Sequence, residues 1–409
     1  MENKENGFYG LGIAPGILEI LKKLNLTTPT PIQVRAIPVA MEGKDVMGVA
    51  QTGTGKTLAF GIPLIQKVLN NKTYGLIIAP TRELAIQIAE ELQKVGRSLG
   101  LRTAVLIGGE PIGKQFHQLS RNPHIIIGTP GRIVDHLEQR SVSFANTHIL
   151  VLDEADRMLD MGFARQLRII MGSLPKERQT MLFSATIPEE IINIARNYLK
   201  LPIRVEVARS GSTAEDITQE LFIVPQEDKP RLLEKVLQDY RGSVLIFCRT
   251  KHAARKITAL VKALGHESAE IHSNRSLSQR KDALSGFKTG KYRVLVATDI
   301  ASRGIDVRNI ELIINYDLPE NPEDYVHRVG RTGRAGDSGH AISFTRPDQK
   351  KDVLAIERLT RSYLPITKLP ALPEKRKLYI RENVGESRGY GQRGGGRSRF
   401  GTRRTPGRR

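Results

Sequence analysis

A glycine-rich stretch early in the chain has the residue types of a phosphate-binding loop. Residues 50–57 read Ala-Gln-Thr-Gly-Thr-Gly-Lys-Thr and lead from an apolar run into a helix-compatible stretch. Gly53 and Gly55 allow backbone N–H groups to turn inward around phosphates at the start of a helix. In such a loop Lys56 reaches the β- and γ-phosphates, and the Thr57 hydroxyl ligates Mg²⁺.

An acidic motif further along the chain supplies the other groups needed to hydrolyse ATP. The apolar run His148–Leu152 ends in Asp153-Glu154-Ala155-Asp156. Asp153 is expected at the carboxyl end of a strand, where it can hold Mg²⁺, and Glu154 is the candidate base that orients and deprotonates the attacking water. For Asp156 a chemical role and a purely structural role, holding a neighbouring side chain or backbone, both stay open.

Size and charge limit the class of protein. The chain has 409 residues, which suits two domains plus a tail. Its 63 Lys and Arg against 43 Asp and Glu give a net charge of +20, which favours nucleic acid over a membrane as partner. No apolar stretch approaches the roughly 20 residues that span a bilayer, and the polar start Met1–Asn6 has no signal-peptide apolar region. The single cysteine, Cys248, excludes an internal disulfide and is expected to be a buried small hydrophobe, as fits a reducing cytoplasm.

Short β-branched runs alternate with helical patterns from Asp45 onward, which indicates βαβ units and mostly parallel sheets. The strands expected in the first half are Leu76–Ala79, Thr103–Ile107, Ile125–Ile127, Ile149–Leu152 and Met181–Phe183. Those expected in the second half are Gln219–Val224, Val244–Cys248, Tyr292–Ala297, Glu311–Asn315 and His340–Phe344, followed by a last helix at Asp348–Tyr363. The polar stretch 208–216 is expected to be a linker between domains 1–207 and 217–367. Because the second half has no Gly-Lys-Thr loop, we expect one nucleotide site, completed from the partner domain.

The C-terminal segment 368–409 is expected to be a disordered basic tail. From Arg381 to Arg409 it contains nine Arg and eight Gly against two acidic residues. Such a composition cannot bury enough apolar surface to fold. The tail is expected to be a nucleic-acid-binding arm, which could also mediate association, or else a solvated tail that only aids solubility.

The phosphate loop departs from the general pattern at Ala50, where the first Gly would stand. This loop followed by Asp-Glu-Ala-Asp resembles the DEAD-box family of ATP-dependent RNA helicases, and the resemblance, from about Phe8 to Thr345, is strongest to the bacterial RhlE-type branch. It implies two tandem RecA-like domains with parallel sheets flanked by helices, which close on ATP, Mg²⁺ and single-stranded RNA and unwind short duplexes locally. An ATP-gated RNA clamp with little unwinding, and a DNA helicase of the same superfamily, stay open as alternatives.

The resemblance implies contacts with each part of the nucleotide. Residues 29–33 match the family's Q motif, in which the amide of Gln33 reads adenine while the ring of Phe8 stacks on the base. Asp306 matches the position that contacts the ribose. The loop residues implied in phosphate binding are Gln51, Thr52, Gly53, Thr54, Gly55, Lys56 and Thr57.

Two further motifs are implied to link hydrolysis to domain closure. Ser184-Ala185-Thr186 matches the family's hydroxyl motif, although an ordinary helix cap is the alternative. Arg331 and Arg334, three residues apart, are expected on one helical face, from which they would enter the γ-phosphate site of the facing domain as arginine fingers.

RNA contacts are implied on both domains. They fall on Pro80, Thr81, Arg82, Gly108, Gly109, Thr129, Arg132, Arg249, Thr250, Arg280 and Thr298. Such groups suit phosphate and 2′-OH contact rather than base reading. The family usually has Gln three residues before the arginine matched by Arg280, whereas this chain has Leu277, with Gln279 at a different offset. This departure puts a local RNA or interdomain contact in question. The expected partner is RNA of no particular sequence, bound by a monomer, in ribosomal or RNA-degradation assemblies.

Overall fold

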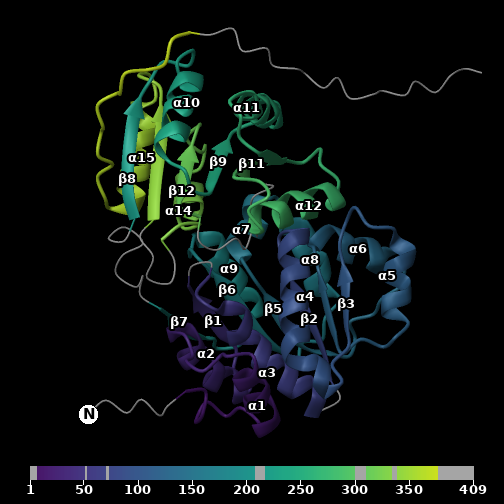
Figure 1. The fold of residues 1–409 in the computed structure, drawn as a ribbon. Helices are drawn as coiled ribbons and strands as arrows, with labels where there is room; N and C mark the ends of the chain where they lie inside the picture. Colours follow the sequence, from purple (N-terminus) through teal and green to yellow (C-terminus); the bar gives the residue numbers. More distant parts are fainter. Residues whose placement is uncertain are drawn as a thin grey trace, which may run out of the picture.

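The computed structural model describes residues 7–50, 53–70, 73–207, 217–299, 310–333 and 339–375. They form two α/β domains, one above the other in Figure 1. The expected linker 208–216 lies outside the described residues, as do the site residues Gln51, Thr52, Asp306 and Arg334. Within the described part of the chain, no helix is long and apolar enough to cross a membrane.

The first domain is built on a seven-stranded sheet in the order β3-β4-β2-β5-β6-β1-β7, with every neighbouring pair parallel. Its strands are β1 (Val46–Val49), β2 (Tyr74–Ile78), β3 (Thr103–Leu106), β4 (Ile125–Gly128), β5 (Thr147–Leu152), β6 (Gln179–Ser184) and β7 (Ile203–Glu206). Its helices are α1 (Pro15–Lys23), α2 (Pro31–Met41), α3 (Lys56–Asn70), α4 (Arg82–Gly96), α5 (Ile112–Leu119), α6 (Pro130–Glu138), α7 (Ala155–Asp160), α8 (Ala164–Gly172) and α9 (Glu189–Tyr198), with the 3₁₀ turn η1 (Arg97–Leu99).

The second domain has a six-stranded parallel sheet in the order β10-β11-β9-β12-β13-β8. Its strands are β8 (Ile217–Ile223), β9 (Val244–Cys248), β10 (Ser268–Ile271), β11 (Val294–Thr298), β12 (Leu312–Asn315) and β13 (Gly339–Thr345). Its helices are α10 (Lys229–Asp239), α11 (Lys251–Ala263), α12 (Leu277–Lys288), α14 (Pro322–Val329) and α15 (Lys350–Thr360).

Each sheet is covered on both faces, which explains the nearly unbroken apolar strands. In β2, Ile77 belongs to the cluster that contains Phe60 of α3, whereas Leu76 and Ile78 belong to the opposite cluster with Ile170 of α8. The second sheet divides its side chains in the same way between two clusters. Strands buried on both faces are typical of parallel sheets joined by helices. The two tandem parallel-sheet domains expected from the sequence are therefore confirmed.

Of the strands missing from the expected list, β7 and β10 lie at a sheet edge, whereas β1 is the apolar run that precedes the phosphate loop. An edge strand has one neighbour fewer, so its sequence carries a weaker apolar signal. The expected last helix is confirmed as the shorter α15, which is followed by Arg361 in the left-handed region, at φ 52°. Cys248 is buried in the second domain as expected, and burial raises the pKa of its thiol.

The start of the tail was placed too early, at residue 368. The N–H of Leu221 donates to the carbonyl of Pro365, and that of Thr367 donates back to Leu221, which ties the segment to β8. Leu369 and Leu372 then pack against the apolar cluster of the second domain. Residues 368–375 thus belong to the folded domain, because they bury apolar side chains, and residues 376–409 lie outside the described part of the chain.

Candidate active site

The predicted groups of the first domain, and the predicted RNA groups of the second, gather at the carboxyl edges of the two sheets. Arg331 instead precedes β13. In the first domain, the phosphate loop, Asp153 and Ser184 follow the adjacent strands β1, β5 and β6. The predicted RNA groups follow the other adjacent trio β2, β3 and β4. In parallel α/β sheets ligands bind at this edge. Strand order therefore separates the predicted nucleotide groups from the predicted RNA groups of this domain.

The phosphate loop packs against the Q motif closely enough to require glycine. Gly53 and Gly55 have φ of 85° and 90°. A Cβ at Gly55 would lie 2.5 Å from Nε2 of Gln33. That Nε2 donates to the carbonyl of Gly55 at 3.0 Å, and Oε1 of Gln33 accepts from the N–H of Thr30 at 2.9 Å. The amide keeps one N–H and one lone pair for an adenine edge.

Among the residues that the structure describes, Nζ of Lys56 and Oε1 of Glu154 are buried at this site without a hydrogen-bond partner. A buried polar group without a partner costs free energy, all the more for a charged ammonium. A phosphate group beside Lys56 and a water beside Glu154 would satisfy both atoms. The residues present therefore fit a nucleoside triphosphate.

Asp153 is a buried carboxylate with the character of a metal ligand. Its Oδ1 accepts from the backbone N–H of Glu154 at 3.0 Å. Burial raises the pKa of Asp153 to about 7, with Lys56 opposing the rise and Glu154 adding to it. A cation at this carboxylate would favour its ionised form. Asp153 and the hydroxyl of Thr57, at the start of α3, thus provide oxygen donors that suit Mg²⁺.

Glu154 is held by an arginine that the sequence analysis did not single out. Its backbone is in the left-handed region, at φ 51° and ψ 52°. Its Oε2 accepts from Nη1 of Arg157 at 2.7 Å, and both side chains are buried. Burial alone would raise the pKa of Glu154, but the charges of Arg157, Lys56 and Arg331 lower it to about 2. The spacing of three residues on a helix was the signal that could have identified Arg157.

Asp156 connects the acidic motif with the hydroxyl motif. Its Oδ2 accepts from the N–H groups of Ala185 and Thr186 at 3.0 and 2.9 Å, and from the Thr186 hydroxyl at 2.9 Å. The N–H of Asp156 donates to Oγ of Ser184 at 3.3 Å. Of the two roles left open for Asp156, the structure shows the positioning one. Ser184 and Thr186 are likewise fixed to the acidic motif rather than acting as a simple helix cap.

The second domain brings Arg331 to the predicted nucleotide groups of the first. Arg331 is buried, and its charge lowers the pKa of Glu154 across the domain boundary. The prediction that it lies on a helical face is wrong. The helix α14 ends at Val329, and the chain then turns through Gly330 and Gly333, the latter at φ 62°. Two glycines so close together do not continue a helix.

The helix α12 carries side chains of the second domain into the first. Leu277 belongs to the hydrophobic cluster of the first domain, and Nε of Arg280 lies 3.1 Å from a carboxylate oxygen of Glu83 at the start of α4. Gln279 does not replace the missing Gln, because its side chain and that of Ser276 form a capping box at the start of α12. An interdomain contact is therefore present at Leu277, although the family usually has Gln there. The contact is apolar, because Leu277 packs in the cluster of the first domain.

The predicted RNA residues of the first domain lie together. The guanidinium of Arg82 covers the backbone of Gly108 and Gly109, since a Cβ at Gly109 would nearly overlap it. Pro80 and Thr81 precede α4, and the Thr81 hydroxyl caps that helix. Thr129 is the N-cap residue of α6, in whose first turn Arg132 donates to the carbonyl of Glu110 at 3.2 Å.

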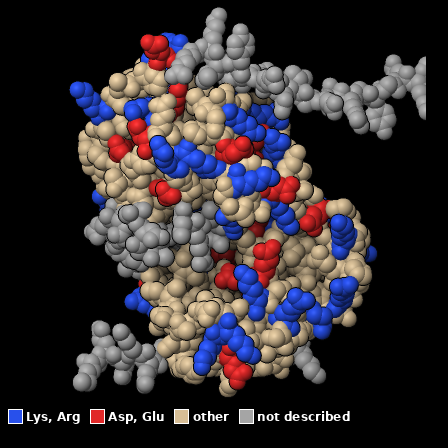
Figure 2. Space-filling view, viewed as in Figure 1, with Lys and Arg blue, Asp and Glu red and all other residues tan. Residues whose placement is uncertain are grey.

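The predicted RNA residues of the second domain follow three adjacent strands. Arg280 lies on α12 after β10, Thr298 ends β11, and Arg249 and Thr250 follow β9. The Thr250 hydroxyl accepts from the N–H of Ala253 and caps α11. Figure 2 shows Lys and Arg side chains gathered on this face, over α11 and α12.

Phe8 does not present a face to a base in this structure. Its side chain is only 4% exposed and belongs to the apolar cluster of the first domain. The predicted stacking role is therefore corrected, because a ring covered by the domain core cannot stack on adenine. Phe8 instead attaches the N-terminal segment to the domain.

Comparisons with known proteins agree with this site. Residues 30–194 match the family model described as DEAD/DEAH box helicase, and residues 228–336 match the Helicase conserved C-terminal domain. The chain is 40% identical to the DEAD-box ATP-dependent RNA helicase CshA of Geobacillus kaustophilus, over 90% of this chain and 79% of that protein. It belongs to the DEAD-box ATP-dependent RNA helicases. It is also 42% identical to the ATP-dependent rRNA helicase RRP3 of Debaryomyces hansenii, over 89% of this chain and 77% of that protein.

The arrangement of the domains resembles that of a relative in complex with its ligands. The structure of S. cerevisiae Dbp5 bound to RNA and ADP BeF3 matches with a TM-score of 0.79 and 30% identity, over 88% of this chain and 95% of that one. Both domains of this DEAD-box protein are therefore RecA-like, and the match includes their relative placement.

Proposed function

We propose that this DEAD-box protein is an RNA-dependent ATPase whose two domains close on ATP and RNA and thereby separate short duplexes locally. The observation that carries the proposal is Arg331, a buried guanidinium of the second domain whose charge acts on Glu154 of the first. Hydrolysis then depends on the domains being together. RNA that binds across the carboxyl edges of the two sheets favours the closed arrangement of the domains, and so stimulates hydrolysis.

The proposed roles follow the geometry. The loop residues and Lys56 bind the phosphates, while Thr57 and Asp153 would hold Mg²⁺, which when bound offsets negative charge on the transferring phosphoryl group. Glu154 orients the attacking water through Oε1. With a pKa of about 2 it is a weak base, so orientation is the larger part of its role. Arg331, with Arg334, stabilises the charge that develops at the γ-phosphate.

The proposal also includes finer assignments. The word rRNA in the name of the Debaryomyces relative supports a role in ribosome assembly. From the sequence we also propose membership of the RhlE-type branch, a role in RNA degradation and a cytoplasmic location. Residues 381–409, with their nine arginines, are proposed to bind RNA.

The test compares ATP hydrolysis with single-stranded RNA and with DNA of the same sequence, beside unwinding of a short RNA duplex. We expect RNA to stimulate hydrolysis strongly and DNA to do so little, with unwinding that needs ATP. Equal stimulation by DNA would contradict the RNA assignment. Stimulated hydrolysis without strand separation would identify the ATP-gated clamp instead.

A further inference from the structure

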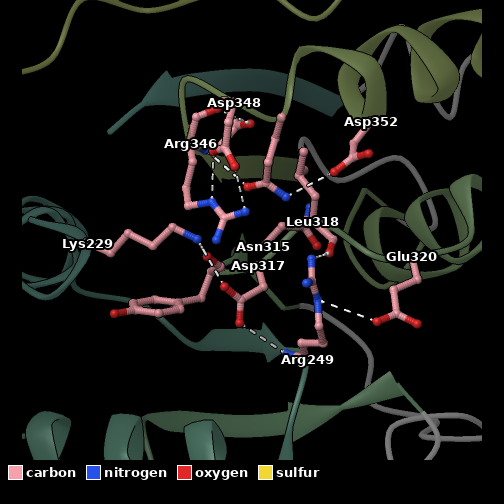
Figure 3. A network of polar contacts seen from close by, with 12 residues as sticks. Lys229, Arg249, Asn315, Asp317, Leu318, Glu320, Arg346, Asp348 and Asp352 are labelled. Atoms are coloured by element: carbon pink, nitrogen blue, oxygen red, sulfur yellow. Dashed lines mark hydrogen bonds and ion pairs between the residues drawn. The ribbon is translucent and has the colours of Figure 1, made fainter. Parts of the chain in front are cut away.

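A polar cavity of about 190 Å³ lies in the second domain, outside the residues assigned to ATP. Its lining includes Lys229, Arg249, Thr250, Asp317, Arg346 and Gln349. Three cations thus surround the cavity, with Asp317 as the acidic residue of its lining. Figure 3 shows Lys229, Arg249 and Arg346 converging around Asp317.

The cations are close enough to repel one another. Nζ of Lys229, a side chain only 1% exposed, donates to the carbonyl of Tyr316 at 2.7 Å and to Oδ1 of Asp317 at 3.0 Å. Burial lowers the pKa of Lys229, and the charges of Arg346 and Arg249 lower it further, against the opposing effect of Asp317. An anion in the cavity would relieve this repulsion.

Within the described part of the chain, both arginines have only exposed carboxylates as ionic partners. Arg346 is 3.0 Å from Asp348, whose side chain is 68% exposed. Arg249 is 3.8 Å from Glu320, whose side chain is 80% exposed. Exposed ion pairs contribute little free energy, so neither pair prevents a guanidinium from turning to a ligand. A planar guanidinium suits a phosphate group in particular.

The backbone adds positive potential to that of the side chains. Lys229 is the first residue of α10, and Thr250 and Gln349 are the N-cap residues of α11 and α15. All three helices therefore direct the positive ends of their dipoles to the cavity. This effect reinforces the preference of the three cations for an anion.

The strand order places the cavity next to the predicted RNA contacts. These contacts follow β10, β11 and β9, and the cavity continues across β12, β13 and β8. Arg249 and Thr250 belong to both sets. We propose that the cavity binds one further backbone phosphate of the RNA strand, beyond Arg249 and Thr250. The inference deepens the proposed function and rests on RNA binding at this edge.

The test measures the affinity of the full chain for single-stranded RNA, with AMP-PNP, over a series of salt concentrations. Arg346→Gln removes a cavity cation, and Arg358→Gln removes an exposed charge of α15 as matched control. We expect Arg346→Gln to lower the affinity about three- to tenfold at low salt and the slope of log K against log salt by about 0.7, the value of one single-strand phosphate contact. Arg346→Lys should restore the slope, and Arg358→Gln should leave it close to that of the wild type.

Shortening the RNA one nucleotide at a time locates the contact. The wild type should lose a step of affinity when the nucleotide in the cavity is removed, and Arg346→Gln should lack that step. Equal slopes for Arg346→Gln and the wild type would overturn the proposal. Binding of inorganic phosphate is measured for both proteins. If Arg346→Gln lost phosphate binding but kept the RNA affinity of the wild type, the proposal would also be overturned, because the cavity would then bind a small anion. RNA-stimulated hydrolysis by the wild type reports separately on the proposed function.

Discussion

At the scale of single residues, the surroundings of Glu154 control two properties of its carboxylate. One is its ionisation, and the other is its orientation. The backbone of Glu154 is in a left-handed conformation that costs free energy outside glycine, and such conformations are often found at functional sites. Arg157 donates to Oε2, whereas Oε1 has no partner among the described residues and is available to water. We infer that Arg157 is a positioning residue, which keeps the carboxylate both ionised and oriented.

Replacing Arg157 by Gln should therefore change the pH dependence of hydrolysis. In the wild type the low pKa of Glu154 keeps it ionised above pH 5. Without Arg157, burial should raise this pKa, so the acid limb of the ATPase profile should move to higher pH. The measurement is the rate at saturating RNA and Mg²⁺ from pH 5.5 to 8.

Glu154→Gln provides the reference for this measurement. It should bind ATP and RNA but lose about 10²- to 10⁴-fold in rate at every pH, because an amide replaces the group that acts on the water. Near-normal turnover in Glu154→Gln would remove the catalytic assignment, and an unshifted acid limb in Arg157→Gln would remove the role given to Arg157.

At the scale of elements, α12 acts as the apolar contact between the domains. Its capping box fixes the first turn, and a spacing of three residues places Leu277 and Arg280 on the same side of the helix. Leu277 reaches the cluster of the first domain, while Arg280 pairs with Glu83. One turn of helix thus combines apolar burial with a buried ion pair.

Leu277→Gln should weaken closure without altering chemistry. Burial of a leucine contributes about 1.5–3 kcal/mol, and an amide in its place would need a new partner. We expect the RNA concentration for half-maximal ATPase to rise about tenfold, with kcat nearly unchanged. Ser278→Gln, on the exposed side of the first turn, is the control. Identical RNA dependence in the two variants would show that Leu277 does not support closure.

At the scale of the whole molecule, the proposed hydrolytic site draws on both domains. The first domain supplies the loop, Asp153 and Glu154, and the second supplies Arg331 from the turn after α14. His327, on α14, is close enough to Arg157, Asp156 and Glu154 for their charges to act on its pKa. A change in the position of α14 should therefore alter the charge around the acidic motif.

Arg331→Ala should reduce kcat for ATP by about 10³-fold or more, while ATP affinity falls much less, because the charge is needed most in the transition state. The measurement is steady-state ATPase at saturating RNA beside equilibrium binding of a nucleotide. Arg331→Lys should recover only part of the rate, since Lys keeps the charge but not the planar guanidinium. An effect confined to KM would mark Arg331 as an ordinary binding residue.

Closure should also depend on pH through His327. In the closed arrangement burial, with the charges of Arg157 and Arg331, lowers the pKa of His327 to about 3, although Asp156 and Glu154 oppose this. When the domains separate, the pKa should return towards about 6.5. The open form then binds a proton that the closed form does not, so closure should weaken up to about tenfold per pH unit as pH falls below 6.5.

Fluorescence energy transfer between the domains, with RNA and AMP-PNP from pH 5.5 to 7.5, measures this effect. His327→Gln should remove this part of the pH dependence, whereas His252→Gln, an exposed position on α11, should retain it. The same pH dependence in both variants would assign the titration to another group.

The sequence by itself determined the local chemistry of this protein. A loop that ends in Gly-Lys-Thr and an acidic motif after an apolar strand each place their groups within a few consecutive residues, so no knowledge of distant contacts is needed. The tertiary structure alone decided which groups meet across the chain. Sheet order separated the predicted nucleotide groups from the predicted RNA groups, and domain placement brought Arg331 to Glu154 and Leu277 to the first core. It also covered Phe8 and added β7 and β10 at the sheet edges. These outcomes depend on packing between segments far apart in the chain, on which a local pattern carries little information.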